Sequence, residues 1–84
     1  MAFSFESGLT DFSVYEVELK KAMVNAANRV VALLDHTKNQ QKNSIASFAS
    51  IDQIDTIITD YAMQDSSLKK FKEHNIDVEV VAIY

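Results

Sequence analysis

Apolar residues recur along the first third of the chain at the spacing of one helix face: Tyr15, Leu19, Ala22, Met23, Ala26 and Val30. Ser13 and Glu16 stand just before and within this segment at the spacing of a capping box, which marks a helix start. The pattern predicts a helix from Ser13 to about Asn28 with the apolar stripe turned inward. On the outer face, opposite charges are expected to pair, Glu16 with Lys20 and Glu18 with Lys21.

Three further apolar segments predict strands. Residues 30–34 are apolar throughout, which is typical of a strand covered on both faces, as in parallel sheets. Residues 56–59 predict a second buried strand, and residues 78–82 a third. The polar residues 35–44 are expected to form a loop, while residues 44–49 fit either a short strand or a helical turn.

Residues 65–74 predict a second helix, with Leu68 and Phe71 inward and Asn75 as its left-handed end. The order helix, strand, turn, strand, helix, strand favours an α/β fold with a mostly parallel sheet of about three strands in a three-layer arrangement. No linker composition divides the chain, so residues 1–84 are expected to form one unit. Because so small a parallel sheet leaves edges and faces uncovered, association into a homo-oligomer is expected.

Composition narrows the class of protein. The net charge of −4 opposes contact with a nucleic acid, and the chain has no cysteine for a disulfide or a thiolate metal site. The longest apolar run, residues 30–34, is far shorter than the roughly 20 residues of a membrane span. With no secretory signal at residues 1–6 either, a cytoplasmic protein is expected.

The strongest candidate for a binding site follows the first predicted strand. Ligands of open α/β sheets bind at the carboxyl ends of strands, where Asp35, Thr37 and Lys38 are placed. Lys38 offers a positive charge for a phosphate, Thr37 a hydroxyl donor and Asp35 an acceptor for sugar hydroxyls. The alternative is a solvated turn in which Asp35 only caps the loop.

Asp60 ends the second predicted strand in the same way, so the two strand ends are expected to share a cleft or, alternatively, to be two capped turns. Gly8 is the only glycine and predicts a turn. His36 and His74 lack neighbouring metal ligands, and no serine sits in a nucleophile elbow. The sequence therefore predicts no metal, no cofactor and no catalytic residue.

Five stretches together resemble the DeoR family of bacterial transcriptional repressors, in particular regulators of sugar uptake and catabolism. They cover nearly the whole chain and keep the order and spacing of the family: residues 8–10, 18–23, 30–38, 54–60 and 76–80. The family's effector domain is similar to the ribose-phosphate isomerase and glucosamine-phosphate deaminase folds, in which a sugar phosphate lies across strand ends. The resemblance implies an effector-sensing role and not an enzyme.

By this resemblance Lys38 is the lysine that faces the phosphate, with Asp35 and Thr37 beside it and Lys20 or Lys21 near the site. Together with Asp60, these residues are the expected ligand-binding set. Two positions depart from the family: the Asp-Ser-Ser-Lys-Phe-Gly segment is replaced here by residues 35–40, and Asn75 stands where a glycine is customary. The first departure is expected to alter the choice of ligand, and the second to be a conservative change of cap.

The resemblance also implies that the chain is a partial domain. Family members begin with a winged helix-turn-helix and the first half of the sensor, and residues 1–84 match only the second half. We therefore expect a fragment that contributes to a phosphorylated-sugar pocket in its full context. The alternatives are an interaction module without ligand binding and, further off, a sugar-phosphate isomerase-like enzyme.

Overall fold

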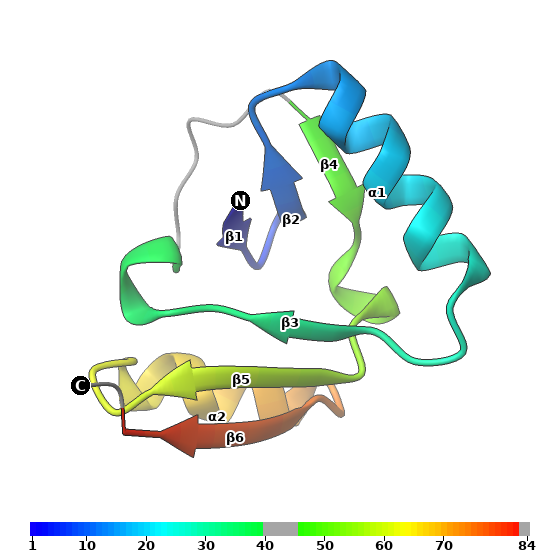
Figure 1. Ribbon diagram of the computed structural model, residues 1–84. Coiled ribbons are helices and arrows are strands. Elements are labelled where there is room, and N and C mark those ends of the chain that lie inside the picture. Colours follow the sequence, from blue (N-terminus) through cyan, green and yellow to red (C-terminus); the bar gives the residue numbers. More distant parts are fainter. Residues whose placement is uncertain (40–45, 83–84) are drawn as a thin grey trace.

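Two three-stranded sheets and two helices make up the part of the chain described by the computed structural model, residues 1–39 and 46–82 (Figure 1). One sheet is antiparallel and the other parallel. Their elements, in chain order, are β1 (Ala2–Ser4), β2 (Gly8–Asp11), α1 (Val14–Ala26), β3 (Val31–Leu33), the 3-10 turn η1 (His36–Lys38), β4 (Ala46–Ala49), the 3-10 turn η2 (Ile51–Gln53), β5 (Thr56–Asp60), α2 (Asp65–Glu73) and β6 (Asp77–Val81).

The antiparallel sheet has the order β1-β2-β4. β1 and β2 form a hairpin that pairs Ala2 with Thr10, and the Ser4 hydroxyl accepts from the Ser7 amide in the turn. Gly8 leaves this turn with φ +71°, a left-handed conformation that glycine adopts without strain. The predicted turn at Gly8 is thus confirmed, whereas β1 and β2 on either side of it were not predicted.

The parallel sheet has the order β3-β5-β6, with Val31 beside Thr56 and Thr56 beside Asp77. It contains the three strands and the parallel pairing that the sequence predicted. α2 connects β5 to β6, and Asn75, two residues after the end of α2, has the expected left-handed φ of 61°. Residues 46–49 form strand β4, which decides the open alternative for that part of the chain, while residues 44 and 45 lie outside the described residues.

α1 begins as predicted, because the Ser13 hydroxyl accepts from the Glu16 amide, and it ends at Ala26. The predicted inner face is wrong. Val17 is the residue of α1 that is buried, whereas Leu19 is 48% exposed and Met23 is 62% exposed. The reason is that α1 packs on the antiparallel sheet through the side that carries Val17 and Val24, about opposite to the longer apolar stripe.

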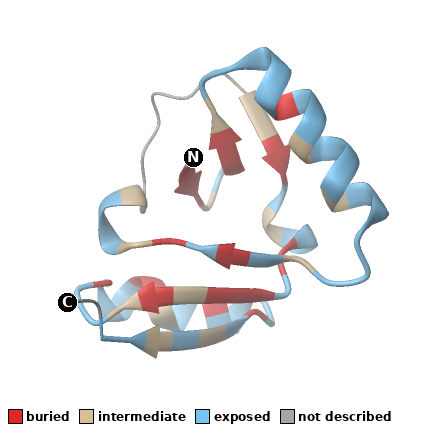
Figure 2. Cartoon of the chain, in the orientation of Figure 1, coloured by how far each residue is buried: buried red, intermediate tan, exposed pale blue. Residues whose placement is uncertain are grey.

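β3 is also exposed where the sequence predicted burial on both faces. Ala32 is buried, whereas Val31 is 48% and Leu33 is 68% exposed (Figure 2). Successive side chains of a strand point to opposite faces, and α2 covers only the face of the sheet that carries Ala32 and Ile57. The apolar run of residues 30–34 therefore has one face in the core and one face uncovered.

The two sheets share one hydrophobic core. Phe3 of β1 and Phe71 of α2 are fully buried, with ring centroids 5.4 Å apart, and Phe5 stands 5.1 Å from Phe71. Phe48 is buried as well and Phe5 packs against the core, so four of the five phenylalanines belong to it. Phe12 is the exception, because it is 53% exposed.

Candidate functional site

The carboxyl ends of β3 and β5 lie side by side at one edge of the parallel sheet. Leu33 is in register with Ile58, and the Leu34 amide donates to the Ile58 carbonyl at 3.0 Å. Immediately beyond this pair, Nδ1 of His36 lies 2.8 Å from Oδ2 of Asp60, and the His36 amide reaches the same oxygen at 3.4 Å. The expected common edge of Asp35 and Asp60 is therefore present, and a histidine that the sequence analysis had set aside connects the two strand ends.

Asp35 caps the turn that follows β3. Its Oδ1 accepts from the Thr37 amide at 2.8 Å and from the Thr37 hydroxyl. The hydrogen bond from the Thr37 hydroxyl is the main reason why the pKa of Asp35 lies below its usual value, so the carboxylate is charged at neutral pH. The capping role that the sequence analysis considered for Asp35 is thus real, and it also fixes the carboxylate at the strand edge.

Asp60 is held in its charged form by His36. The hydrogen bond from His36 is the largest cause of the lowered pKa of Asp60. Only 13% of the Asp60 side chain is exposed, and its second oxygen, Oδ1, is buried without a hydrogen-bond partner in the described part of the chain. This oxygen is therefore a buried acceptor at the end of β5.

Two other oxygens, Oγ1 of Thr59 and Oδ1 of Asn39, are also buried without a partner among residues 1–39 and 46–82. Buried polar atoms of folded proteins almost always have a partner, and those without one point to a bound water, ion or ligand. Thr59 and Asp60 are the last residues of β5, and Asn39 follows η1, so the three oxygens come from the two chain segments that end at this edge.

Two hollows open at the same edge. One of about 240 Å³ is lined by Asp35 and Thr59 together with the apolar residues Leu33, Leu34, Ile58 and Val81. The other, of about 180 Å³, is lined by His36, Asn39, Ala62, Met63 and Gln64. Each is smaller than the roughly 300 Å³ at which ligand pockets usually begin, and together they offer polar groups above an apolar floor.

α2 begins beside the second hollow. Gln64 occupies the capping position of α2 and forms no side-chain hydrogen bond to the helix start. The amides of a first helical turn carry a partial positive charge that favours anions. Asn39 Nδ2 donates to the Ser67 hydroxyl at 2.8 Å and ties η1 to this helix start.

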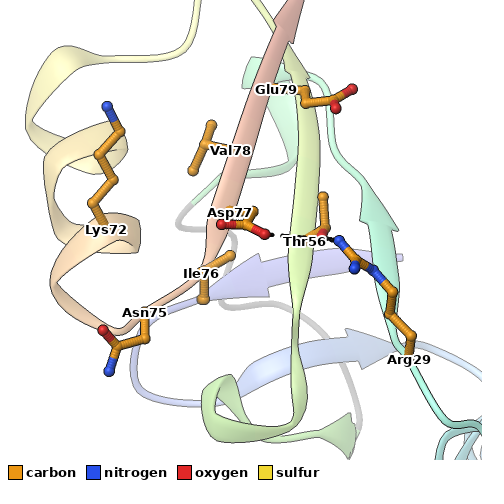
Figure 3. Close-up of a pocket in the computed structure, with 8 residues that line it drawn as sticks. All are labelled: Arg29, Thr56, Lys72, Asn75, Ile76, Asp77, Val78 and Glu79. Carbon is orange, nitrogen blue, oxygen red and sulfur yellow. Dashed lines mark hydrogen bonds and ion pairs between the residues drawn. The ribbon is translucent and has the colours of Figure 1, made fainter.

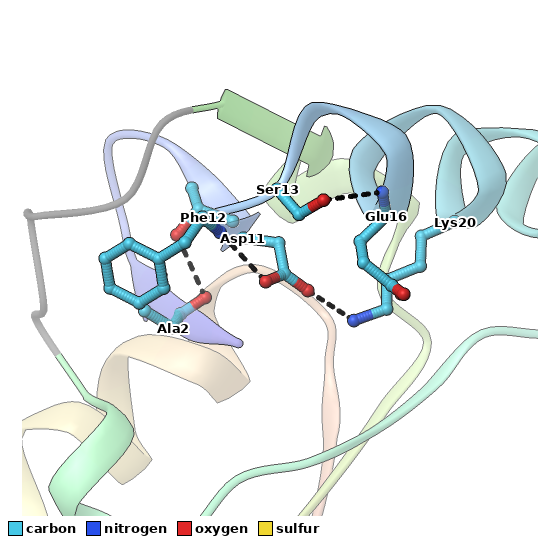
Figure 4. A network of polar contacts seen from close by, with 7 residues as sticks. Ala2, Asp11, Phe12, Ser13, Glu16 and Lys20 are labelled. Carbon is cyan, nitrogen blue, oxygen red and sulfur yellow. Dashed lines mark hydrogen bonds and ion pairs between the residues drawn. The ribbon is translucent and has the colours of Figure 1, made fainter.

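The lysines of the expected set fall into two groups. Lys38 is half-buried in η1, and its amide donates to the Asp35 carbonyl at 3.1 Å, so it belongs to the edge. Lys21 is exposed on α1, on the other side of the molecule from η1 (Figure 1). Lys20 is also on α1, where it forms an ion pair with Asp11 (Figure 4) and lies over the Phe48 ring. The predicted pair of Glu16 with Lys20 is replaced by this contact.

A larger hollow of about 620 Å³ lies at the opposite end of the parallel sheet, where β5 and β6 begin (Figure 3). Arg29 donates from Nη2 to the Thr56 hydroxyl and lies 3.8 Å from Asp77 Oδ2. Lys72 and Asn75, at the end of α2, complete the rim. The carboxyl end of α2, which is the negative end of the helix dipole, lies here, as do the carboxylates of Asp77 and Glu79. These negative charges disfavour the binding of an anion. For a phosphorylated ligand the smaller hollows at the carboxyl edge are the better candidates.

Other classes of site find no support in the described residues. Residues 1–39 and 46–82 contain no group of three or more side chains that could hold a metal ion. Within the same ranges, no helix has the length and apolar character needed to cross a membrane.

A comparison with known families covers the segments that form this edge. The family model of the DeoR C-terminal sensor domain matches residues 1–61, which include β3, η1 and β5 up to Asp60. The chain belongs to this family. The resemblance noted in the sequence is confirmed, and so is the expectation of a regulator's sensor domain in place of an enzyme.

Individual relatives of the chain are named as transcriptional regulators or repressors as well. The HTH-type transcriptional regulator GolR of Listeria innocua is 42% identical over 78 residues, which are 93% of this chain and 30% of the relative. The HTH-type transcriptional regulator IolR of Bacillus subtilis is 30% identical over 73 residues, covering 87% of this chain and 29% of the relative. The glycerol-3-phosphate regulon repressor of Escherichia coli is 27% identical over 75 residues, covering 89% and 29%. The chain thus spans less than a third of the length of these relatives.

Proposed function

We propose that this chain is the effector-sensing part of a DeoR-type transcriptional regulator of sugar metabolism and contributes Asp35, Thr37, Lys38 and Asp60 to a pocket for a phosphorylated sugar. The name of the Escherichia coli relative, which refers to glycerol 3-phosphate, supports a phosphorylated effector of this class. The expected likeness to half of a ribose-phosphate isomerase or glucosamine-phosphate deaminase fold is part of the same proposal.

The observation that carries the proposal is the cluster of buried oxygens without partners at the carboxyl edge. Thr59 Oγ1, Asp60 Oδ1 and Asn39 Oδ1 can act as acceptors, and a sugar supplies hydroxyl donors. Leaving such an oxygen unpaired costs about 1–3 kcal/mol, so a ligand that pairs it gains a comparable free energy. Hydroxyl recognition is therefore assigned to the β5 end of the edge.

The phosphate is assigned to the η1 side of the edge. Asp35 and Asp60 are charged and would repel a phosphate placed directly between them. Positive charge in this region comes from the ammonium group of Lys38 and from the amides at the uncapped start of α2. In this arrangement the two carboxylates bind hydroxyls, and the phosphate lies between Lys38 and the helix start.

The proposal is tested by nuclear magnetic resonance on the 84-residue chain, titrated with glucose 6-phosphate, glucose and inorganic phosphate. A chain that provides only part of a pocket is expected to bind weakly, with a dissociation constant on the order of 1 mM. The amide signals of Asp35, Thr37, Lys38, Thr59 and Asp60 should move with the phosphorylated sugar, and less with glucose or phosphate alone.

Matched variants separate a specific site from general attraction of anions. Lys38→Met should weaken binding of glucose 6-phosphate at least threefold, whereas Lys69→Met, which removes an exposed lysine from α2, should leave it unchanged. Asp60→Asn should weaken the response to the sugar more than the response to phosphate. Signals that move around Arg29 and Lys72 instead would place the site at the opposite end of the sheet and refute the proposal.

A further inference from the structure

His36 makes the side-chain contact that joins the end of β3 to the end of β5. Its Nδ1 lies 2.8 Å from Oδ2 of Asp60, whereas its amide lies 3.4 Å from the same oxygen, near the limit of a hydrogen bond. The side-chain contact is therefore the stronger of the two. It holds the imidazole of η1 against a residue that is 24 positions away in the chain.

This contact fixes which ring nitrogen of His36 carries a proton. Asp60 is charged at neutral pH, so its carboxylate can only accept, and the proton between the two groups belongs to Nδ1. Nε2 is then the remaining polar atom of the ring. It is a hydrogen-bond acceptor while the ring is neutral and a charged donor once the ring is protonated.

His36 also lines the hollow of about 180 Å³ that opens beside the start of α2. Of the described residues that line this hollow, it is the one whose side chain can carry a charge. The side chain of His36 is 48% exposed, whereas that of Asp60 is 13% exposed. Because Nδ1 is engaged by the less exposed carboxylate, Nε2 is left as the ring nitrogen for a ligand in the hollow.

The charge of this region changes with pH mainly through His36. Histidine is the side chain whose charge ordinarily changes between about pH 5 and about pH 8. The hydrogen bond from the Thr37 hydroxyl lowers the pKa of Asp35, and the hydrogen bond from His36 lowers that of Asp60, so both carboxylates stay charged in this range. The titratable groups of the described chain around the ring come from η1 with its cap, from the end of β5 with the following turn, and from the start of α2: Asp35, Lys38, Asp60, Tyr61 and Asp65.

We propose that His36 is a further ligand-binding residue of the carboxyl edge, whose protonated Nε2 donates to the phosphate group of the ligand while Asp60 holds the ring in place. This inference rests on the proposed function, which assigns the phosphate to the η1 side. Protonation replaces a lone pair that faces the anion with a charged donor, and hydrogen bonds between charged groups are the strong ones. Affinity for the phosphate group therefore rises as the pH falls through the range in which histidine gains its proton.

Inorganic sulfate is the probe for the first test, because it stays a dianion throughout the neutral range, whereas a phosphate monoester changes its own charge at about pH 6. The amide signals of the 84-residue chain are followed by nuclear magnetic resonance during titrations at about pH 5.5 and about pH 7.5, at constant ionic strength. The native chain should bind sulfate about threefold or more tightly at the lower pH.

Matched variants of the two histidines separate this site from a general change of charge. His36→Gln keeps an amide nitrogen near the position of Nε2 but cannot be protonated, so the pH dependence should disappear. At the higher pH this variant should bind sulfate at least as tightly as the native chain, since it presents a donor where the neutral ring presents a lone pair. His74→Gln removes the other histidine of the chain, which is exposed at the end of α2, and should keep the full pH dependence.

The ring nitrogens provide a direct readout. At the lower pH, sulfate should shift the nitrogen-15 signal of Nε2 of His36 and leave both ring nitrogens of His74 unchanged. Circular dichroism of each variant verifies that the fold is retained.

Three results would each overturn this inference alone. Sulfate could bind the native chain equally at both pH values. The pH dependence could persist in His36→Gln. This variant could also lose the same factor of affinity at both pH values, which would indicate a structural role. If the signals of the edge respond to neither sulfate nor glucose 6-phosphate, the phosphate assignment of the proposed function is refuted, and the role of His36 with it.

Discussion

Replacing Gly8 by alanine should destabilise the fold by roughly 2–5 kcal/mol, because two penalties meet at this position. The φ of +71° holds Gly8 in the left-handed region, where a residue with a Cβ atom loses about 1–2 kcal/mol. An added Cβ would also stand 2.0 Å from the carbonyl oxygen of Ala49. That oxygen belongs to the backbone of β4, so relief requires the β2–β4 pairing to separate, at about 1–3 kcal/mol or more.

The expected loss from Gly8→Ala is large compared with the total free energy of unfolding of the chain. A domain of 84 residues is expected to have a free energy of unfolding of roughly 4–13 kcal/mol. Urea unfolding followed by far-ultraviolet circular dichroism measures the loss, and with a slope of about 1 kcal/mol per molar urea the midpoint should fall by about 2 M or more. Ser7→Ala is the matched control, because Ser7 is exposed in the same turn and contributes its backbone amide to the hydrogen bond with Ser4. Equal midpoints for Gly8→Ala and Ser7→Ala would refute this reasoning.

Two further outcomes are expected. The pKa of Asp11 is lowered, chiefly by the hydrogen bond from Lys20, so its contribution to stability is complete above the ordinary value of about 3.9 and is lost as the pH falls through the lower folded value. Asp11→Asn should therefore flatten the decline in the free energy of unfolding between about pH 5 and about pH 2, and an equally steep decline would contradict this. Phe71→Ala should cost about 3–5 kcal/mol and Phe71→Leu clearly less, since Phe71 is fully buried between two other rings; similar losses in urea unfolding would argue against the ring packing.

Elements with a strong local signal were predictable from the sequence. The Ser13 cap fixed the start of α1, Asn75 fixed the end of α2, and the three strands of the parallel sheet appeared as apolar runs. β1 and β2 were missed because each has only three or four residues, too few to show an alternating pattern. Gly8 was their one local sign, and it indicated the turn without the strands.

Burial was harder to predict than secondary structure. The stripe of Tyr15, Leu19 and Met23 has the spacing of a core-facing helix, and residues 30–34 have the composition of a strand covered on both sides. Periodicity shows that a face is apolar, but it does not show which other element covers it. In this chain Val17 faces the core, and the more apolar face of α1 remains uncovered.

The candidate site was predictable only in part, for a similar reason. Asp35 and Asp60 could be placed at one edge because parallel strands end together. The contact of His36 with Asp60 depends on the β3–β5 register, which the sequence does not specify. The one available signal was that His36 and Asp60 each follow closely on an apolar strand.

The contact between Phe3 and Phe71 constrains how the chain reaches its folded state. These rings come from opposite ends of the sequence and both are fully buried, so the core stays incomplete until α2 has been made. During synthesis the apolar residues of β1 therefore cannot complete the core before α2 has left the ribosome. Closing so long a loop is slow relative to forming a local helix, and this core is expected to form in one cooperative step once α2 has been synthesised.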